Sequence, residues 1–184
     1  IAFLMLKANQ SIAKENFSKA HEMVQEVLSY EPENKEALAK QEEIAKLEKM
    51  HRDQDLIEEW FQQAQVFYDS EMKEEACGCI VDLLKIAKEY GNLKTIREFK
   101  EKLQRQMPDL FEEAATIAER DWVQAEEYSK KGKNLFEQDQ FKEALEYFEK
   151  ALLIDPYCEN FQNLKSKTNK KIKLSEIAAY HKDG

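Results

Sequence analysis

The sequence predicts an all-α protein of stacked antiparallel helical hairpins, and three observations carry that prediction. Glycine and proline are rare, with 4 Gly and 3 Pro among 184 residues, which is too few for the turns of a sheet-rich fold. Apolar residues recur at helical spacing along most of the chain. Charged residues make up 35% and hydrophobic residues 42%, a balance that indicates a globular rather than a disordered chain.

Three apolar stripes mark the best-defined helices, and each ends at a residue that stops helices. The first stripe ends before Pro32, the second before a left-handed cap at Gly91-Asn92, and the third before Pro156. Pro108 opens a further helix, since proline is favoured in a first turn. Short connections make sequence neighbours antiparallel, and nine or ten helices are expected in total. The stripes comprise Phe17, Ala20, Val24, Val27 and Leu28; Ala76, Ile80, Leu83, Leu84 and Ala87; and Phe141, Ala144, Leu145, Phe148, Ala151 and Leu152.

Two arrangements remain open between residues 33 and 77, where the chain contains neither Pro nor Gly. In the first, a helix from Asn34 to Met50 is followed by a second helix whose N-terminus is capped by Asp53 or Asp55. In the second, one continuous helix covers residues 34–67. A final helix over residues 161–180, with a polar outer face, is expected to keep the array soluble.

The segment from Tyr128 to Pro156 contains the most specific pattern in the chain. It reads Tyr128-x-x-Lys131-Gly132-x-x-Leu135, followed by Ala144-x-x-x-Phe148-x-x-Ala151 and Pro156. This pattern resembles the tetratricopeptide repeat, a helix–turn–helix unit of 34 residues. The resemblance implies that the two helices cross closely where Gly132 and Ala144 are small, and that Phe148 packs against the neighbouring unit.

Weaker copies of the same pattern occur at fixed offsets. Subtracting 68 gives a copy that begins at Trp60, and subtracting 124 gives one that begins at Leu4. Residues 91–124 fill one repeat length but match poorly, and we interpret them as a degenerate hairpin. The resemblance implies a right-handed superhelix in which residues 1–50 form an N-terminal hairpin plus an extra helix. Residues 51–184 then hold the hairpins 57–90, 91–124 and 125–158 and the C-terminal helix.

The sequence offers no signature of catalysis or of a cofactor. Its four glycines lie too far apart to form a phosphate-binding loop. None of the three histidines has a partner at the i,i+4 spacing of helical metal sites, and no second Cys or His pair completes a site with Cys77 and Cys79. We therefore expect a non-enzymatic protein without cofactor or metal.

Charge is distributed unevenly along the chain. The net charge of −9 argues against a nucleic-acid partner. Residues 161–184, however, carry six Lys against Glu176 and Asp183, a local charge of +4, while the remainder carries −13. This basic patch is either a solvated helix face or a docking surface. It consists of Lys165, Lys167, Lys170, Lys171 and Lys173.

The sequence also indicates a compartment. It has no apolar run of eighteen residues, so no membrane insertion is expected. Three cysteines without an evident pairing favour a reducing compartment, and we expect the cytoplasm. The chain begins at Ile1 rather than Met, which is compatible with a native N-terminus that is missing from it.

Function in a helical repeat comes from its surface, and the first helix of each hairpin lines the concave side. Phe61 is favoured there, because its neighbour Trp60 already occupies a core position. For Tyr68 and Phe136, burial between repeats is an equally good interpretation. The expected groove residues are Met5, Asn9, Phe61, Gln65, Tyr68, Lys133 and Phe136.

Apolar, aromatic and amide groups together suit an extended or helical peptide laid in a groove. One branch of the tetratricopeptide family grips C-terminal carboxylates with a Lys and an Asn one turn apart. Here Met5 stands in the place of that Lys and only Asn9 remains, which disfavours this activity. The predicted function is a non-catalytic scaffold or adaptor for a partner protein or peptide. The alternative is a structural subunit that self-associates through its acidic body and basic C-terminal helix.

Overall fold

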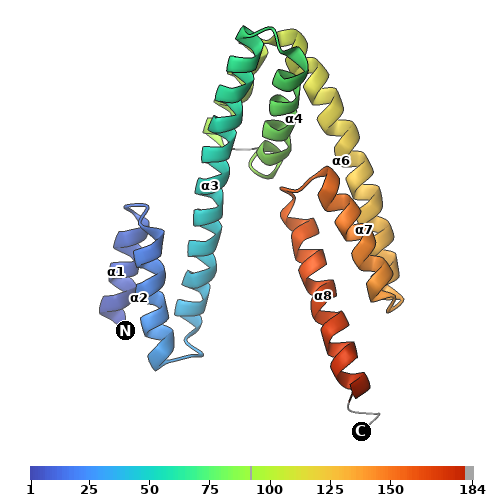
Figure 1. Cartoon of the computed structure of the whole chain (residues 1–184). Helices are drawn as coiled ribbons and strands as arrows, with labels where there is room; N and C mark the ends of the chain where they lie inside the picture. Colours follow the sequence, from blue (N-terminus) through green and yellow to red (C-terminus); the bar gives the residue numbers. More distant parts are fainter. Residues whose placement is uncertain (92, 181–184) are drawn as a thin grey trace. The chain divides into compact units, whose positions relative to one another are not determined.

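The computed structural model describes residues 1–91 and 93–180, which fold into helices without any strand (Figure 1). The all-α prediction is thereby confirmed. Eight helices form over the described residues, fewer than the nine or ten expected, because α3 and α6 are each a single long helix. They are α1 (Ala2–Ile12), α2 (Phe17–Tyr30), α3 (Lys35–Asp69), α4 (Lys73–Glu89), α5 (Lys94–Gln106), α6 (Pro108–Glu137), α7 (Phe141–Ile154) and α8 (Glu159–Tyr180).

Helix α3 settles the choice left open between residues 33 and 77. It begins after Asn34, whose side-chain oxygen accepts a hydrogen bond from the Ala37 amide at 2.9 Å, as an N-cap does. It then runs for 35 residues, so Asp53 and Asp55 lie in the helix interior and the capping role expected for them is wrong. With neither Gly nor Pro in this stretch, no residue forces a break.

The ends of α2, α4 and α7 lie close to where the sequence placed them. Helix α2 ends two residues before Pro32 and α7 two residues before Pro156. The C-cap of α4 is Tyr90, and Gly91 does not have the positive φ expected of a left-handed cap. Asn92, the second residue of that expected cap, lies outside the described residues.

The chain divides into two compact units, Ile1–Leu56 and Ile57–Gly184, and the boundary falls within α3. The first unit contains α1, α2 and the first part of α3. Its core is built from small and branched apolar residues: Met5, Ala8, Ala20, Val24, Val27, Ala37 and Ile44. The second unit contains the rest of α3 and helices α4 to α8, and its largest fully buried side chains include Phe148 and Phe161.

The turns after α1, α3 and α6 share one backbone geometry. Each contains a non-glycine residue with a positive φ: Glu15 (57°), Glu71 (62°) and Asp139 (58°). In each turn the next amide donates to the carbonyl five residues earlier, as in a Schellman motif. These bonds join Asn16 to Ser11 (2.9 Å), Met72 to Phe67 (2.9 Å) and Gln140 to Leu135 (3.0 Å). The three turns lie 68 and 124 residues apart, at the offsets of the repeat copies, so the backbone reproduces the register read from the sequence.

The hairpin of α6 and α7 has the close helix crossing that its sequence predicts. Gly132 on α6 lies directly against the buried Phe148 ring of α7. A Cβ atom added to Gly132 would lie only 2.7 Å from Cε1 of that ring. Ala144 and Ala151 on α7 are also fully buried. Glycine is therefore required at residue 132 by contact with an aromatic neighbour, not by backbone conformation.

Candidate functional site

The structure places two of the expected groove residues in the core. Met5 in the Ile1–Leu56 unit is 4% exposed, whereas Asn9 on the same helix is exposed. Phe61 is 9% exposed, and its ring centroid lies 5.5 Å from that of Phe99 on α5. This burial corrects the expected exposure of Phe61: it is Trp60 that is only half-buried.

The remaining expected groove residues, on α3 and α6, lie nearer the surface. On α3, Gln65 is half-buried and Tyr68 is exposed. On α6, Lys133 and Phe136 are both half-buried. Phe136 is therefore partly exposed, unlike a fully buried core residue.

Phe136 connects the expected groove to the expected basic patch. Its ring packs edge-on against Phe141 with centroids 5.1 Å apart, and the Lys167 ammonium of α8 lies 5.5 Å from its centroid. Lys171 follows Lys167 by one helical turn and so lies on the same face of α8. We call Lys133, Phe136, Lys167 and Lys171 the Phe136 surface. Within the described residues none of these three lysines forms an ion pair.

The other lysines of the patch lie on a different side of α8. Lys165 pairs with Glu149 of α7 at 3.0 Å. Together with Leu152 of α7, Lys165, Lys170 and Lys173 line an open depression of about 420 Å³. The patch is therefore two surfaces, one beside α6 and one beside α7.

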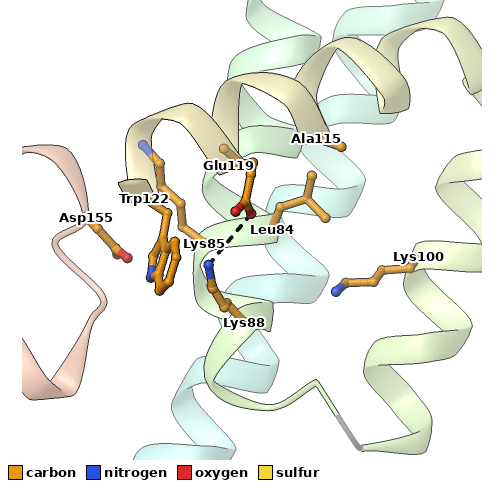
Figure 2. A pocket seen from close by; sticks show the side chains of 9 residues that line it. Leu84, Lys85, Lys88, Lys100, Ala115, Glu119, Trp122 and Asp155 are labelled. Atoms are coloured by element: carbon orange, nitrogen blue, oxygen red, sulfur yellow. Dashed lines mark ion pairs between the residues drawn. The ribbon is translucent and has the colours of Figure 1, made fainter. Parts of the chain in front are cut away.

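A pocket that the sequence did not suggest lies among α4, α5 and α6, all in the Ile57–Gly184 unit (Figure 2). Its volume is about 260 Å³. Apolar and charged side chains line it together, and one charged residue, Asp155, comes from the connection between α7 and α8. The lining consists of Leu84, Lys85, Lys88, Lys100, Ala115, Ala118, Glu119, Trp122 and Asp155. We call it the Lys88–Lys100 pocket.

Lys88 is held between an aromatic ring and a carboxylate. Its ammonium lies 3.1 Å from the centroid of the Trp122 ring and 3.8 Å from the Glu119 carboxylate, and Figure 2 marks this ion pair. Burial lowers the pKa of Lys88, while the carboxylates of Glu119 and Asp155 act in the opposite direction. The Lys88 side chain stays 42% exposed, so solvent still reaches this cation and its long ion pair.

Lys85 is fully engaged, and Asp155 has a structural role. The Lys85 ammonium lies 3.0 Å from Asp121 and donates to the Ile154 carbonyl at 2.9 Å. Asp155 accepts a hydrogen bond from the Tyr157 amide at 3.2 Å, which shapes the turn into α8. Burial raises the pKa of Asp155.

Lys100 differs from both of these lysines. It is half-buried on α5, and no ion pair is formed by it within the described residues. Figure 2 shows its side chain reaching toward the part of the pocket that Lys88 and Leu84 line. The sequence could not reveal this arrangement, because Lys88, Lys100 and Trp122 lie on three different helices.

The cysteine side chains of the chain are all shielded from solvent. Cys77, Cys79 and Cys158 are buried, and burial raises the pKa of each thiol, so they are poor nucleophiles. In the part of the chain that is described, no group of three His, Cys, Asp or Glu residues is placed to hold a metal ion. None of the described helices has the length and apolar character needed to cross a membrane.

Two family models match the chain. One, described as a helical bundle domain, matches residues 3–108, and the other, the tetratricopeptide repeat, matches residues 125–158. The second match covers the Tyr128–Pro156 pattern and confirms the resemblance in that segment. Tetratricopeptide repeats serve protein–protein interaction in general, and helical repeats of this type are generally non-enzymatic. No curated protein and no solved structure gave a significant match.

Proposed function

Because the chain belongs to the helical bundle domain family and carries a tetratricopeptide repeat at residues 125–158, we propose that it is a non-catalytic scaffold or adaptor. In this proposal it binds a segment of a partner protein on the Phe136 surface, on the first-helix side of that repeat.

The observation that supports this proposal is the contact between Phe136 and Lys167. It joins a half-buried aromatic ring to an ammonium group that has no acidic partner among the described residues. An aromatic side chain offers a large contact area, while unpaired cations favour a partner of opposite charge. The surface therefore fits a partner segment in which an apolar side chain is flanked by Asp or Glu.

Peptide selection tests the proposal directly. A random peptide library displayed on phage is selected on the whole chain, and the enriched sequence is synthesised with a fluorophore for anisotropy titration. We expect enriched peptides to combine acidic residues with an apolar anchor. Reversing both charges with Lys133→Glu and Lys167→Glu should weaken binding about tenfold, since each exposed pair contributes up to about 1 kcal/mol.

The matched control is Lys142→Glu, which reverses an exposed charge on α7 outside the Phe136 surface. Its affinity for the peptide should fall far less than that of the double variant. Equal binding by wild type and the double variant, or enriched peptides without acidic residues, would remove the Phe136 surface from the proposal.

Self-association is the second candidate, and it is favoured by Lys170 and Lys173 on α8, neither of which forms an ion pair with another described residue. In that case the basic helix meets the acidic body of another copy. Light scattering separates the two functions: a mass that falls as salt rises supports charge-driven assembly, and a monomer at all salt concentrations excludes it. For either function we propose a reducing compartment, the cytoplasm, since all three cysteines are free.

A further inference from the structure

We propose that the Lys88–Lys100 pocket is a second binding site, which takes the carboxylate side chain of a glutamate from a partner protein. The inference rests on the proposed scaffold function, but it concerns a surface outside the Phe136 surface. Its evidence is that Lys100, without an acidic partner among the described residues, and Lys88, with only a long ion pair, line one pocket together with apolar side chains.

The lysines of the pocket differ in how far each is paired with an acidic group. Lys85 is already neutralised by Asp121 at 3.0 Å. Lys88 has three N–H donors but faces Glu119 at 3.8 Å, too far for a good hydrogen bond. Lys100 has no acidic partner among the described residues. A half-buried ammonium without a partner is costly, and a bound carboxylate would offset that cost.

The same charges disfavour a phosphate dianion. Glu119 and Asp155 both line the pocket and would repel a doubly charged group more strongly than a singly charged one. No arginine lines it, so the bidentate donor that typically recognises phosphate is missing from this lining. A carboxylate carries a single charge, and Lys100 supplies one cation without an acidic partner among the described residues.

The walls of the pocket favour a short aliphatic stem behind the carboxylate. Leu84, Ala115 and Ala118 are apolar, and the Trp122 indole stands beside Lys88 (Figure 2). A volume of about 260 Å³ is below the usual size of a small-molecule pocket, which suits a single side chain. Glutamate supplies two methylene groups for these walls and a carboxylate for the lysines.

Trp122 makes the proposal measurable without a known partner. The chain has two tryptophans, so Trp60→Phe leaves Trp122 as the only one. The probe is N-acetylglutamate amide, and the control is N-acetylglutamine amide, which has the same shape without charge. We expect saturable change of Trp122 fluorescence with the glutamate probe only, because drawing the Lys88 ammonium away from the indole alters its environment. If Trp60→Phe fails to fold, binding can be followed instead by the NMR shift of the Trp122 indole N–H signal in ¹⁵N-labelled wild type.

Lys100→Met should weaken binding of the glutamate probe about fivefold to tenfold, as loss of a partly desolvated ion pair does. The matched control is Lys94→Met on the same helix, because Lys94 is exposed and pairs with Glu98 at 3.6 Å. Lys94→Met should leave the affinity unchanged. An equal affinity in Lys100→Met overturns the assignment.

Two further titrations identify the source of the anion. If free glutarate or inorganic phosphate binds as tightly as the capped glutamate, or binds when the capped glutamate does not, the occupant is not a protein side chain. Weak binding of both supports a protein side chain as the occupant. Since the probe reports on Trp122 alone, failure here leaves the peptide selection at the Phe136 surface unaffected, and the two proposals fail separately.

Discussion

Gly132→Ala tests whether the close crossing of α6 and α7 depends on the absence of a single methyl group. Two effects oppose each other. Alanine is favoured over glycine inside a helix by about 1 kcal/mol. The new Cβ, however, would lie 2.7 Å, 2.9 Å and 3.0 Å from three atoms of the Phe148 ring, which is fully buried and has little space to move. Overpacking of this kind costs about 1–3 kcal/mol, so the net loss of stability should be up to about 2 kcal/mol.

Gly78→Ala is the matched control. Gly78 also lies inside a helix, α4, but an added Cβ would meet no atom within 4 Å. Only the helix preference remains, and the substitution should stabilise the protein by about 1 kcal/mol. The two glycine-to-alanine changes should therefore differ by about 1–3 kcal/mol, and they should differ in sign if overpacking is stronger than helix preference.

Urea unfolding followed by tryptophan fluorescence measures both variants. Trp60 and Trp122 both lie in the Ile57–Gly184 unit, as do the two glycines, so the signal reports the unit that is perturbed. Equal stabilisation by Gly132→Ala and Gly78→Ala would refute the packing argument. A change of the m-value would instead indicate that the variants alter the unfolding transition itself.

Four further predictions concern charge, protonation, backbone and thiols. Lys85→Met should destabilise the fold by about 1–2 kcal/mol in urea unfolding, because it leaves the half-buried Asp121 with only the exposed Arg120 at 3.3 Å. A loss below about 0.5 kcal/mol would contradict this. Since burial raises the pKa of Asp155, its charged form disfavours folding, so Asp155→Asn should be most stabilising at neutral pH. That advantage should vanish as pH falls through the raised pKa and wild type takes up its proton, and a gap independent of pH would exclude the mechanism. Glu71→Gly should raise stability by about 1 kcal/mol, because φ is 62° there, and an unchanged or lower urea midpoint would argue against strain. The three buried cysteines should react slowly with a thiol reagent until urea is added, and fast labelling of the native chain would show that they are accessible.

The hairpin of α6 and α7 could be predicted because the local sequence determines which of its residues pack together and where its helices end. Gly132, Ala144 and Phe148 follow a spacing that fixes which side chains meet, and Pro156 marks where α7 has to end. The extent of α6 could not be predicted in this way. It continues through residue 124, where a repeat boundary was expected, because no residue there interrupts a helix that Pro108 begins.

The candidate sites were less accessible to sequence reasoning, since they depend on contacts between distant residues. Phe61 is buried by Phe99, which lies in the stretch that matches the repeat poorly. The link between Phe136 and Lys167 joins two residues that the sequence singled out for separate reasons. Helical spacing indicates which face a residue occupies, but it does not indicate which other helix covers that face.

The three segments whose turns share one backbone geometry carry different side chains at corresponding places. At the place of Gly132 the other copies have Ala8 and Ala64, both fully buried, and at the place of Phe148 they have Val24 and Ile80. The small residue is thus glycine in the segment that has an aromatic residue at the second place, and alanine in the segments that have a branched residue there. It follows that Gly132→Ala should be tolerated once Phe148→Ile is added, so that the pair reproduces the combination in α3 and α4. A double-mutant cycle should then yield a favourable coupling of about 1 kcal/mol or more. Simple additivity of the two changes would mean that the three crossings are not packed by the same rule.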